Sequence, residues 1–287
     1  MNIPRSSFPR IVIIGGGFAG ISLAKRLRNK NVQVVLLDKH NYHNFQPLMY
    51  QVATGGLEPD SIAYPIRKIV QEYKDFYFRL AEVRDIDAEN NTIYSDIGEL
   101  KFDYLVIATG SKTNYFGNKE IERNSMAMKT IPQSLNIRSL ILENFEQALL
   151  TKMKKAILPK DYPDLDVRKM EINLIQGSNR VLDSMSENAS EKAEKFLLDL
   201  GVSVWKNVRV TGYDGKTVTT NSDLSFDSAT VIWTAGVQGA LPHGLKADSF
   251  IKNVNRIKVN QYNQIEGYDN LFAIGDIAVM TSEEFPQ

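Results

Sequence analysis

Short apolar runs alternate with helical patterns along the first part of the chain. The runs Arg10–Ile14 and Val32–Leu37 predict buried strands, because they are apolar almost throughout and end at a glycine turn and at an acid. Between them, Phe18–Asn29 has apolar residues at helical spacing and basic residues on the other side. Strand, glycine turn, helix and strand in under 30 residues predict a parallel βαβ unit with a right-handed crossover.

The rest of the chain adds more strands and two helices. One helix is predicted over Ser134 to about Leu158, ended by Pro159–Pro163, and the other over Ser186–Leu200, with Gly201 at the position of a C-cap glycine. The predicted strands are Phe76–Asp87 and Thr92–Tyr94, both as a meander, then Tyr104–Ala108, Glu171–Ile175, Val202–Trp205, Val208–Gly212, Thr217–Thr220, Ala229–Thr234 and a last one within Asn270–Asp276. This alternation predicts an α/β fold.

Composition excludes several classes of protein. The length of 287 residues suggests about two domains, and 43% apolar with 24% charged residues is an ordinary globular composition. Lys plus Arg and Asp plus Glu are both 34, so the chain lacks the basic excess of a nucleic-acid-binding protein. With no cysteine, disulfides, thiolate metal sites and cysteine nucleophiles are excluded. No apolar stretch reaches the roughly 20 residues of a spanning helix, and Met1–Arg10 lacks the apolar core of a signal peptide.

The first candidate motif is the run Gly15, Gly16, Gly17, Phe18, Ala19 and Gly20, which matches G-x-G-x-x-G. The motif needs a glycine for the tight turn, one for the approach of a pyrophosphate and one for close packing of helix on strand. Here it follows a strand, opens a helix and is followed by Asp38, 21 residues after Gly17, where an acid accepts hydrogen bonds from a ribose. The alternative is a plain glycine turn with a surface aspartate.

Two further motifs are weak by themselves. Ala108-Thr109-Gly110 follows a buried strand, and it is also a common kind of small-residue turn. Gly275-Asp276 follows a strand near the end of the chain, and the alternative there is a turn glycine with a helix N-cap aspartate. Taken in order, the three motifs indicate a sheet that is assembled from distant segments around one long ligand.

Longer segments carry a family resemblance. They are Phe45–Ile69 (FQPLMYQVATGGLEPDSIAYPIRKI), Asp103–Ser111 (DYLVIATGS), Ser134–Leu150 (SLNIRSLILENFEQALL), Val231–Val237 (VIWTAGV) and Asn270–Ala278 (NLFAIGDIA). With the glycine motif they resemble the type II NADH dehydrogenases, the single-subunit NADH:quinone oxidoreductases of the two-dinucleotide-binding flavoprotein superfamily. The resemblance implies a Rossmann-like FAD-binding domain formed by residues 1–133 and 238–287, with a second Rossmann-like domain, shortened, inserted as residues 134–237.

The resemblance also implies roles for individual residues. Gly15 to Gly20 would hold the pyrophosphate of FAD, and Asp38 with Lys39 the adenosine ribose. The backbone of Glu82 and Val83 would meet the adenine, Thr109 and Gly110 would lie beside the flavin, and Asp276 would hold the ribityl chain. Gln46 and Pro47 would lie near the isoalloxazine on the quinone side. NADH and a quinone are the implied partners, at the cytoplasmic face of a membrane as a peripheral protein, with a homo-oligomer possible.

Two departures from the family pattern change the expected function. The second G-x-G-x-x-G, with the glutamate that follows it in its helix, is absent: after Phe145–Thr151 the chain passes into Lys152–Pro159, which resembles the far end of the missing helix. The loss is about one βα unit, on the order of 30 residues, so we expect weak NADH binding and exposed strand edges that favour association. Gln176 also stands where the family has an acid for the NADH ribose. The family pattern continues beyond Gln287 with a helix over the flavin and membrane-docking helices.

Several alternatives stay open. The chain is expected to be an NADH:quinone oxidoreductase or, without NADH turnover, a catalytically impaired flavin-binding protein of that family. A flavin monooxygenase or an ordinary NAD-dependent dehydrogenase would explain the first βαβ unit only. We expect no metal site, and His40 and His43 are interpreted as surface or loop histidines. Aromatic residues such as Tyr42 and Tyr50 either line a quinone path or pack within their loop.

Overall fold

The computed structural model describes residues 1–145 and 171–280. They divide into two compact units: unit 1 contains Met1–Pro47, Glu58–Thr113 and the chain from Gly236 onward, and unit 2 contains Leu48–Leu57 and Asn114–Ala235. The predicted continuation of the long helix beyond Phe145 and the segment Lys152–Pro159 lie outside the described residues.

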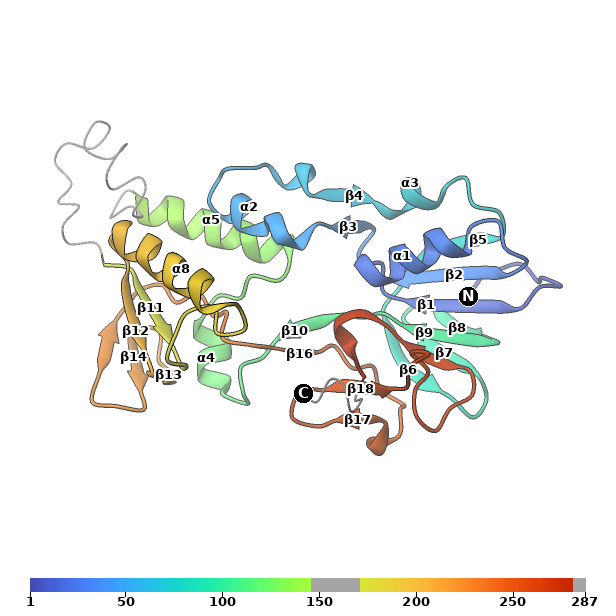
Figure 1. Cartoon of the computed structure of the whole chain (residues 1–287). Helices are drawn as coiled ribbons and strands as arrows, with labels where there is room; N and C mark the ends of the chain where they lie inside the picture. The colour runs from blue at the N-terminus through green and yellow to red at the C-terminus, as the bar shows by residue number, and fades with distance from the viewer. Residues whose placement is uncertain (146–170, 281–287) are drawn as a thin grey trace. The chain divides into compact units, whose positions relative to one another are not determined.

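Unit 1 is built on a five-stranded parallel sheet with the order β19-β9-β1-β2-β5. Its strands β9, β1, β2 and β5 are labelled in Figure 1. The strands are β1 (Arg10–Ile14), β2 (Gln33–Asp38), β5 (Phe76–Leu80), β9 (Tyr104–Ile107) and β19 (Leu271–Ala273). All four neighbouring pairs run parallel. The sheet therefore joins segments more than 250 residues apart in sequence, and the predicted α/β class with a parallel, Rossmann-like sheet is confirmed.

Side chains that alternate along the strands form two apolar layers. On one face Ile13 and Leu36 pack with Ile21 and Ala24 of α1 (Phe18–Leu27) and with Ile66 of α3 (Ile66–Val70). The other face packs against the meander of β6 (Val83–Asp87), β7 (Thr92–Ser95) and β8 (Gly98–Lys101) and against β18 (Arg256–Val259). Both faces are covered, as an all-parallel sheet requires.

Smaller elements complete unit 1. They are β3 (Tyr42–Asn44) paired with β4 (Ala63–Pro65), β10 (Ser111–Thr113) paired with β16 (Val237–Gly239), β17 (Phe250–Ile251) and β20 (Ala278–Met280) on either side of β18, and the short turns η2 (Pro59–Ser61), η4 (Ala247–Ser249) and η5 (Gly275–Ile277). The turn η1 (Gln46–Leu48) leads out of unit 1.

Unit 2 combines helices with two small sheets. Its helices are α2 (Met49–Ala53), α4 (Lys119–Asn124), α5 (Ile131–Phe145) and α8 (Glu187–Asp199). The strands β11 (Asn173–Gln176) and β12 (Ser203–Lys206) run parallel with α8 between them, and β13 (Val210–Tyr213), β14 (Thr217–Thr220) and β15 (Ser225–Asp227) form an antiparallel sheet. All four residues of β11 are only half-buried, so this βαβ unit lacks the fully enclosed strand seen in unit 1.

Three predictions of secondary structure need correction. The strand expected over Phe76–Asp87 is two strands: its first half pairs with β2 in the parallel sheet, and only the second half belongs to the meander. The strand expected over Ala229–Thr234 is a single bridge between Ile232 and Met126, because the segment meets no longer partner. The first helix ends at Leu27, and Asn29 at φ 59° turns the chain toward β2.

Candidate functional site

Three sequence motifs converge at the carboxyl ends of the parallel strands in unit 1. Gly15 follows β1, Thr109 follows β9 and Gly275 follows β19, while Asp38 ends β2. The chain order runs from β1 through α1 to β2 on one side, and β9 lies on the other side of β1. Such a switch point is where open parallel sheets bind their ligands.

The glycine loop is packed so closely that two of its positions admit no side chain. Gly15 has φ +110°, and a Cβ there would lie 2.3 Å from the carbonyl oxygen of Ala108. A Cβ on Gly20 would lie 1.9 Å from the carbonyl oxygen of Gly15. The first turn of α1 therefore lies directly against the end of β1, which is the close helix–strand packing that the motif predicts.

Gly17 faces open space instead. No atom lies within 4 Å of the position that its Cβ would take, and the residue is exposed. It is the N-cap of α1, no side chain caps the helix, and the first turn contains no acid. An uncapped helix N-terminus presents N–H groups and partial positive charge, so this space is suited to a phosphate group.

Asp38 is engaged with the backbone around the loop. Its Oδ2 accepts from the N–H of Gly16 at 2.5 Å, and its Oδ1 accepts from the N–H of His40 at 2.7 Å. Each carboxylate oxygen has a further lone pair, so the group can still accept from ribose hydroxyls. Burial, and after it the charge of Asp38, raises the pKa of Tyr42. Lys39 is exposed beside Asp38.

The middle and last motifs lie on the other side of the glycine loop. Thr109 Oγ1 is buried and has no hydrogen-bond partner within the described part of the chain. Asp276 is exposed, and its Oδ2 accepts from the hydroxyl of Ser111 at 2.9 Å. A Cβ on Gly275, at φ +77°, would lie 2.9 Å from the Cβ of Ala19 in α1, so the last motif touches the first. Asp276 lies inside the turn η5 and is not a helix N-cap.

The positions of two other predicted residues, Val83 and Gln46, follow from the contacts of their neighbours. Val83 begins β6 two residues after Ala81, whose N–H donates to the carbonyl oxygen of Asp38 at 2.9 Å, so it lies near the end of β2. Gln46 is exposed in η1 and follows Phe45. The centroid of the Phe45 ring lies 5.5 Å from that of the Phe18 ring. No described contact joins Gln46 or Val83 to the glycine loop itself.

One residue of the loop's surroundings was not predicted. His43 is half-buried in β3, where its Nδ1 lies 3.0 Å from the carbonyl oxygen of Gly16. Its interpretation as a surface or loop histidine is therefore wrong. The sequence offered little signal for it, because a single histidine without a charged partner has no pattern to identify it.

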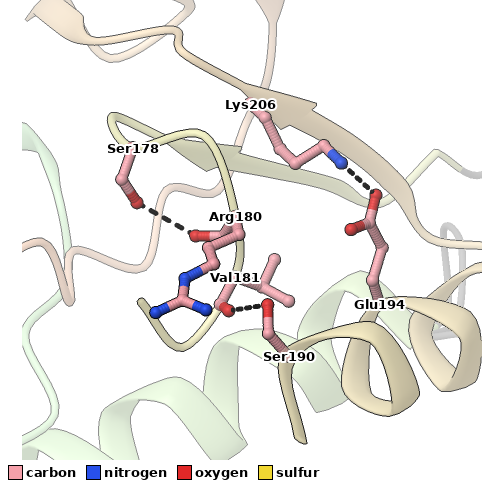
Figure 2. Close-up of polar contacts among 6 residues, drawn as sticks. All are labelled: Ser178, Arg180, Val181, Ser190, Glu194 and Lys206. Carbon is pink, nitrogen blue, oxygen red and sulfur yellow. Dashed lines mark hydrogen bonds and ion pairs between the residues drawn. The ribbon is translucent and has the colours of Figure 1, made fainter. Parts of the chain in front are cut away.

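In unit 2, the loop after β11 is held by side-chain hydroxyls (Figure 2). The amide Nε2 of Gln176 donates to Ser178 Oγ at 2.6 Å, and that hydroxyl donates to the carbonyl oxygen of Arg180 at 2.9 Å. Ser190 Oγ of α8 donates to the carbonyl oxygen of Val181 at 2.6 Å. The strand thus ends in a neutral amide that is already bonded to its own loop.

An ion pair joins the helix to the sheet beside this loop. Lys206 of β12 contacts Glu194 of α8 at 2.7 Å (Figure 2). No group of three or more potential metal ligands occurs in residues 1–145 and 171–280, and no helix in those ranges is long and apolar enough to cross a membrane.

The parallel sheet, its switch point and the glycine loop define a dinucleotide-binding α/β protein. The sequence profile of the pyridine nucleotide-disulphide oxidoreductases matches residues 9–287, and the chain belongs to this family. Members of the family bind FAD and NAD(P)H. The 287 residues contain no cysteine, so none of them can form a redox disulfide.

Relatives within the family are NADH:quinone oxidoreductases. The chain is 30% identical to the type II NADH:quinone oxidoreductase Ndh of Mycobacterium tuberculosis, over 94% of this chain and 67% of the relative. It is 28% identical to NdhA of the same organism, over 93% of this chain and 66% of that protein. An external alternative NAD(P)H-ubiquinone oxidoreductase, B2, of Arabidopsis thaliana is 26% identical, over 96% of this chain and 55% of its own length. The chain thus spans between about half and two thirds of these relatives.

Solved structures share the fold at lower identity. The structure of NDH2 from Plasmodium falciparum in complex with NADH superposes with a TM-score of 0.83 at 21% identity, over 95% of this chain and 65% of that one. The sulfide:quinone oxidoreductase of Aquifex aeolicus gives a TM-score of 0.81 at 20% identity, over 94% and 69% of the two chains.

Proposed function

We propose that unit 1 is the FAD-binding domain and that the chain is an FAD-dependent oxidoreductase of the NADH:quinone type. The observation that carries the proposal is the convergence of three distant motifs at the carboxyl ends of the parallel strands. There Gly17 faces open space, the N-terminus of α1 has no side-chain cap, and the buried hydroxyl of Thr109 has no hydrogen-bond partner among residues 1–145 and 171–280. The identities to type II NADH:quinone oxidoreductases support it.

The residues present fit this cofactor. The open space at Gly17 and the first turn of α1 would take the pyrophosphate, and Asp38 with Lys39 the adenosine ribose. The backbone at Val83 would meet the adenine. On the other side of the loop, Thr109 Oγ1 and Gly110 would lie beside the flavin, and Asp276 would accept from the ribityl hydroxyls. Gln46 would lie toward the quinone.

Bound FAD would supply the redox chemistry, taking a hydride from NADH and passing two electrons to a quinone. The protein would contribute placement and electrostatics. The helix terminus would neutralise the phosphates, and the exposed carboxylate of Asp276, held by Ser111, would orient the flavin's chain. We propose that unit 2 is the nicotinamide domain, shortened at its beginning, and that a membrane surface and a quinone are the partners.

A second candidate is a flavoprotein that binds FAD but does not turn over NADH. The sequence has one G-x-G-x-x-G only, and Gln176 replaces the acid at the end of β11. The alignment to the mycobacterial Ndh is 311 positions long, whereas 94% of this chain is about 270 residues, so about 40 positions of that alignment have no counterpart here. This is the length expected for a missing βα unit, which is about 30 residues or more.

The visible absorption spectrum, followed by anaerobic NADH, separates the two candidates. A flavin band that bleaches with NADH and recovers with menadione supports the oxidoreductase. A flavin band that dithionite bleaches and NADH does not supports the second candidate. Protein that stays colourless after incubation with FAD and gel filtration contradicts both.

A further inference from the structure

Gly16 is held at both of its backbone polar atoms by side chains from outside the glycine loop. Its N–H donates to Asp38 Oδ2 at 2.5 Å, and its carbonyl oxygen lies 3.0 Å from Nδ1 of His43. Because a carbonyl oxygen can only accept, Nδ1 of His43 must carry the proton in this contact. Asp38 ends β2 and His43 is the middle residue of β3, so two strands fix one residue of the loop.

The ring of His43 also packs on Phe18, the residue that follows Gly17. The centroids of the His43 and Phe18 rings lie 5.0 Å apart with an interplanar angle of 86°, and those of Phe18 and Phe45 lie 5.5 Å apart. His43 therefore contacts the chain just before Gly17 through its nitrogen and just after it through its ring. Gly17 itself has no neighbour at its Cβ position to hold it.

We infer that His43 is a positioning residue for the phosphate loop. Glycine has wide backbone freedom, so without a partner the carbonyl of Gly16 is free to turn toward the open space above Gly17. A carbonyl oxygen there would face the negative charge of a pyrophosphate. The Nδ1–H of His43 holds this oxygen away and leaves the N–H groups of the first turn of α1 to face the anion. The phosphate loop is thereby preorganised for the anion. This inference rests on the FAD site proposed above.

Two substitutions at His43 separate its donor from its ring. His43→Asn places an amide N–H near the position of Nδ1 and removes the ring. His43→Phe keeps an aromatic ring against Phe18 and removes the donor. We expect His43→Phe to raise the dissociation constant of FAD about tenfold, the factor for one lost hydrogen bond, and His43→Asn to stay within about twofold of the wild type. His40→Asn and His40→Phe are matched controls, because the His40 ring packs on Tyr42 at 5.3 Å, and both should bind FAD like the wild type.

The measurements are FAD binding by quenching of flavin fluorescence and amide hydrogen exchange of residues 15–20 in the protein without FAD. The inference predicts faster exchange in His43→Phe and protected amides in His43→Asn. If His43→Asn binds weakly and His43→Phe binds normally, the ring and not the donor matters, and the inference is overturned. If the wild type binds no FAD, the proposed function fails, while the exchange data still decide whether His43 orders the loop. If His43→Phe does not fold, wild-type affinity in His43→Asn supports the donor's role, and a loss there contradicts it.

Discussion

At the scale of single residues, the glycines of the loop Gly15–Gly20 have different structural roles. Gly20 excludes a side chain because its Cβ would meet the Gly15 carbonyl, whereas Gly17 has φ −74° and free space. We expect Gly20→Ala to lower the free energy of unfolding by about 1–3 kcal/mol, as overpacking does. Urea unfolding without FAD would measure this, and a change below about 0.5 kcal/mol would show that α1 can move away from β1.

Gly17→Ala tests the proposed position of the pyrophosphate rather than the packing of the fold. The new methyl group would enter only open space, so we expect a loss of stability below about 1 kcal/mol, from the poorer N-cap. The same methyl would occupy the position proposed for the pyrophosphate, so FAD affinity should fall at least tenfold. Flavin fluorescence titration of Gly17→Ala beside the wild type checks this. Unchanged affinity would place the phosphates elsewhere.

The residues of the site differ in how far the sequence could reveal them. Gly15, Gly20 and Asp38 follow a fixed spacing that is dictated by one βαβ unit, and the structure brings them together as that spacing predicts. His43 depends on the path of a separate hairpin, in which it pairs with Tyr64. No local pattern specifies that path, so its contact with Gly16 becomes visible only in three dimensions.

At the scale of elements, the sequence located several strands closely but did not reveal the partner of every strand. β1 and β14 have the predicted bounds, since β-branched runs mark them. β5 was assigned to the meander because its sequence leads into β6 without a strong turn signal, yet it pairs with β2. Pairing between segments far apart is a property of the whole chain, and apolar periodicity does not encode it.

The strand β19 is followed by a turn whose backbone conformation favours glycine. Gly275 follows it at φ +77°, and its Cα faces Ala19 of α1. We expect Gly275→Ala to destabilise the protein by about 1–3 kcal/mol, from the unfavourable φ and the 2.9 Å contact, and to weaken FAD binding by displacing Asp276. Gly267→Ala is the control for φ alone, since Gly267 has φ +83° and nothing near its Cβ position. Equal losses in the two variants would mean that the contact with α1 contributes nothing.

The turn between β13 and β14 is expected to respond to acid. The N–H groups of Thr217 and Lys216 donate to Asp214 Oδ1 at 2.7 and 2.8 Å, and these bonds lower the pKa of Asp214 below its usual 3.8. A lowered pKa adds stability that is present above pH 3.8 and is lost as the pH falls through the folded-state pKa. Asp214→Asn keeps an acceptor and removes the titration. Its Tm should therefore fall less than the wild-type Tm between pH 5 and pH 3, and parallel Tm curves would refute the assignment.

At the scale of the whole molecule, the proposal assigns the two ligands to separate units. The proposed FAD site lies entirely in unit 1, where five of the six residues of β2 are buried. In unit 2, all four residues of β11 are half-buried, and this strand ends in Gln176. A ligand that binds only the folded protein stabilises it by an amount that its concentration and dissociation constant fix. Thermal stability therefore reports on each ligand independently of turnover.

We expect FAD at 100 times its dissociation constant to stabilise the wild type by about 2.7 kcal/mol, and NADH at the same concentration to give a smaller shift because its binding is expected to be weak. Differential scanning calorimetry with FAD alone, NADH alone and both would show this. Gly17→Ala keeps the fold and loses the proposed phosphate position. At the same FAD concentration a tenfold loss of affinity should reduce its stabilisation to about 1.4 kcal/mol, and a larger loss should reduce it further. A clear shift with NADH alone in the wild type would mean that unit 2 binds nicotinamide nucleotide without the missing βα unit. Combined with flavin bleaching, that result would favour the oxidoreductase over the impaired flavoprotein, because hydride transfer requires both ligands on one molecule.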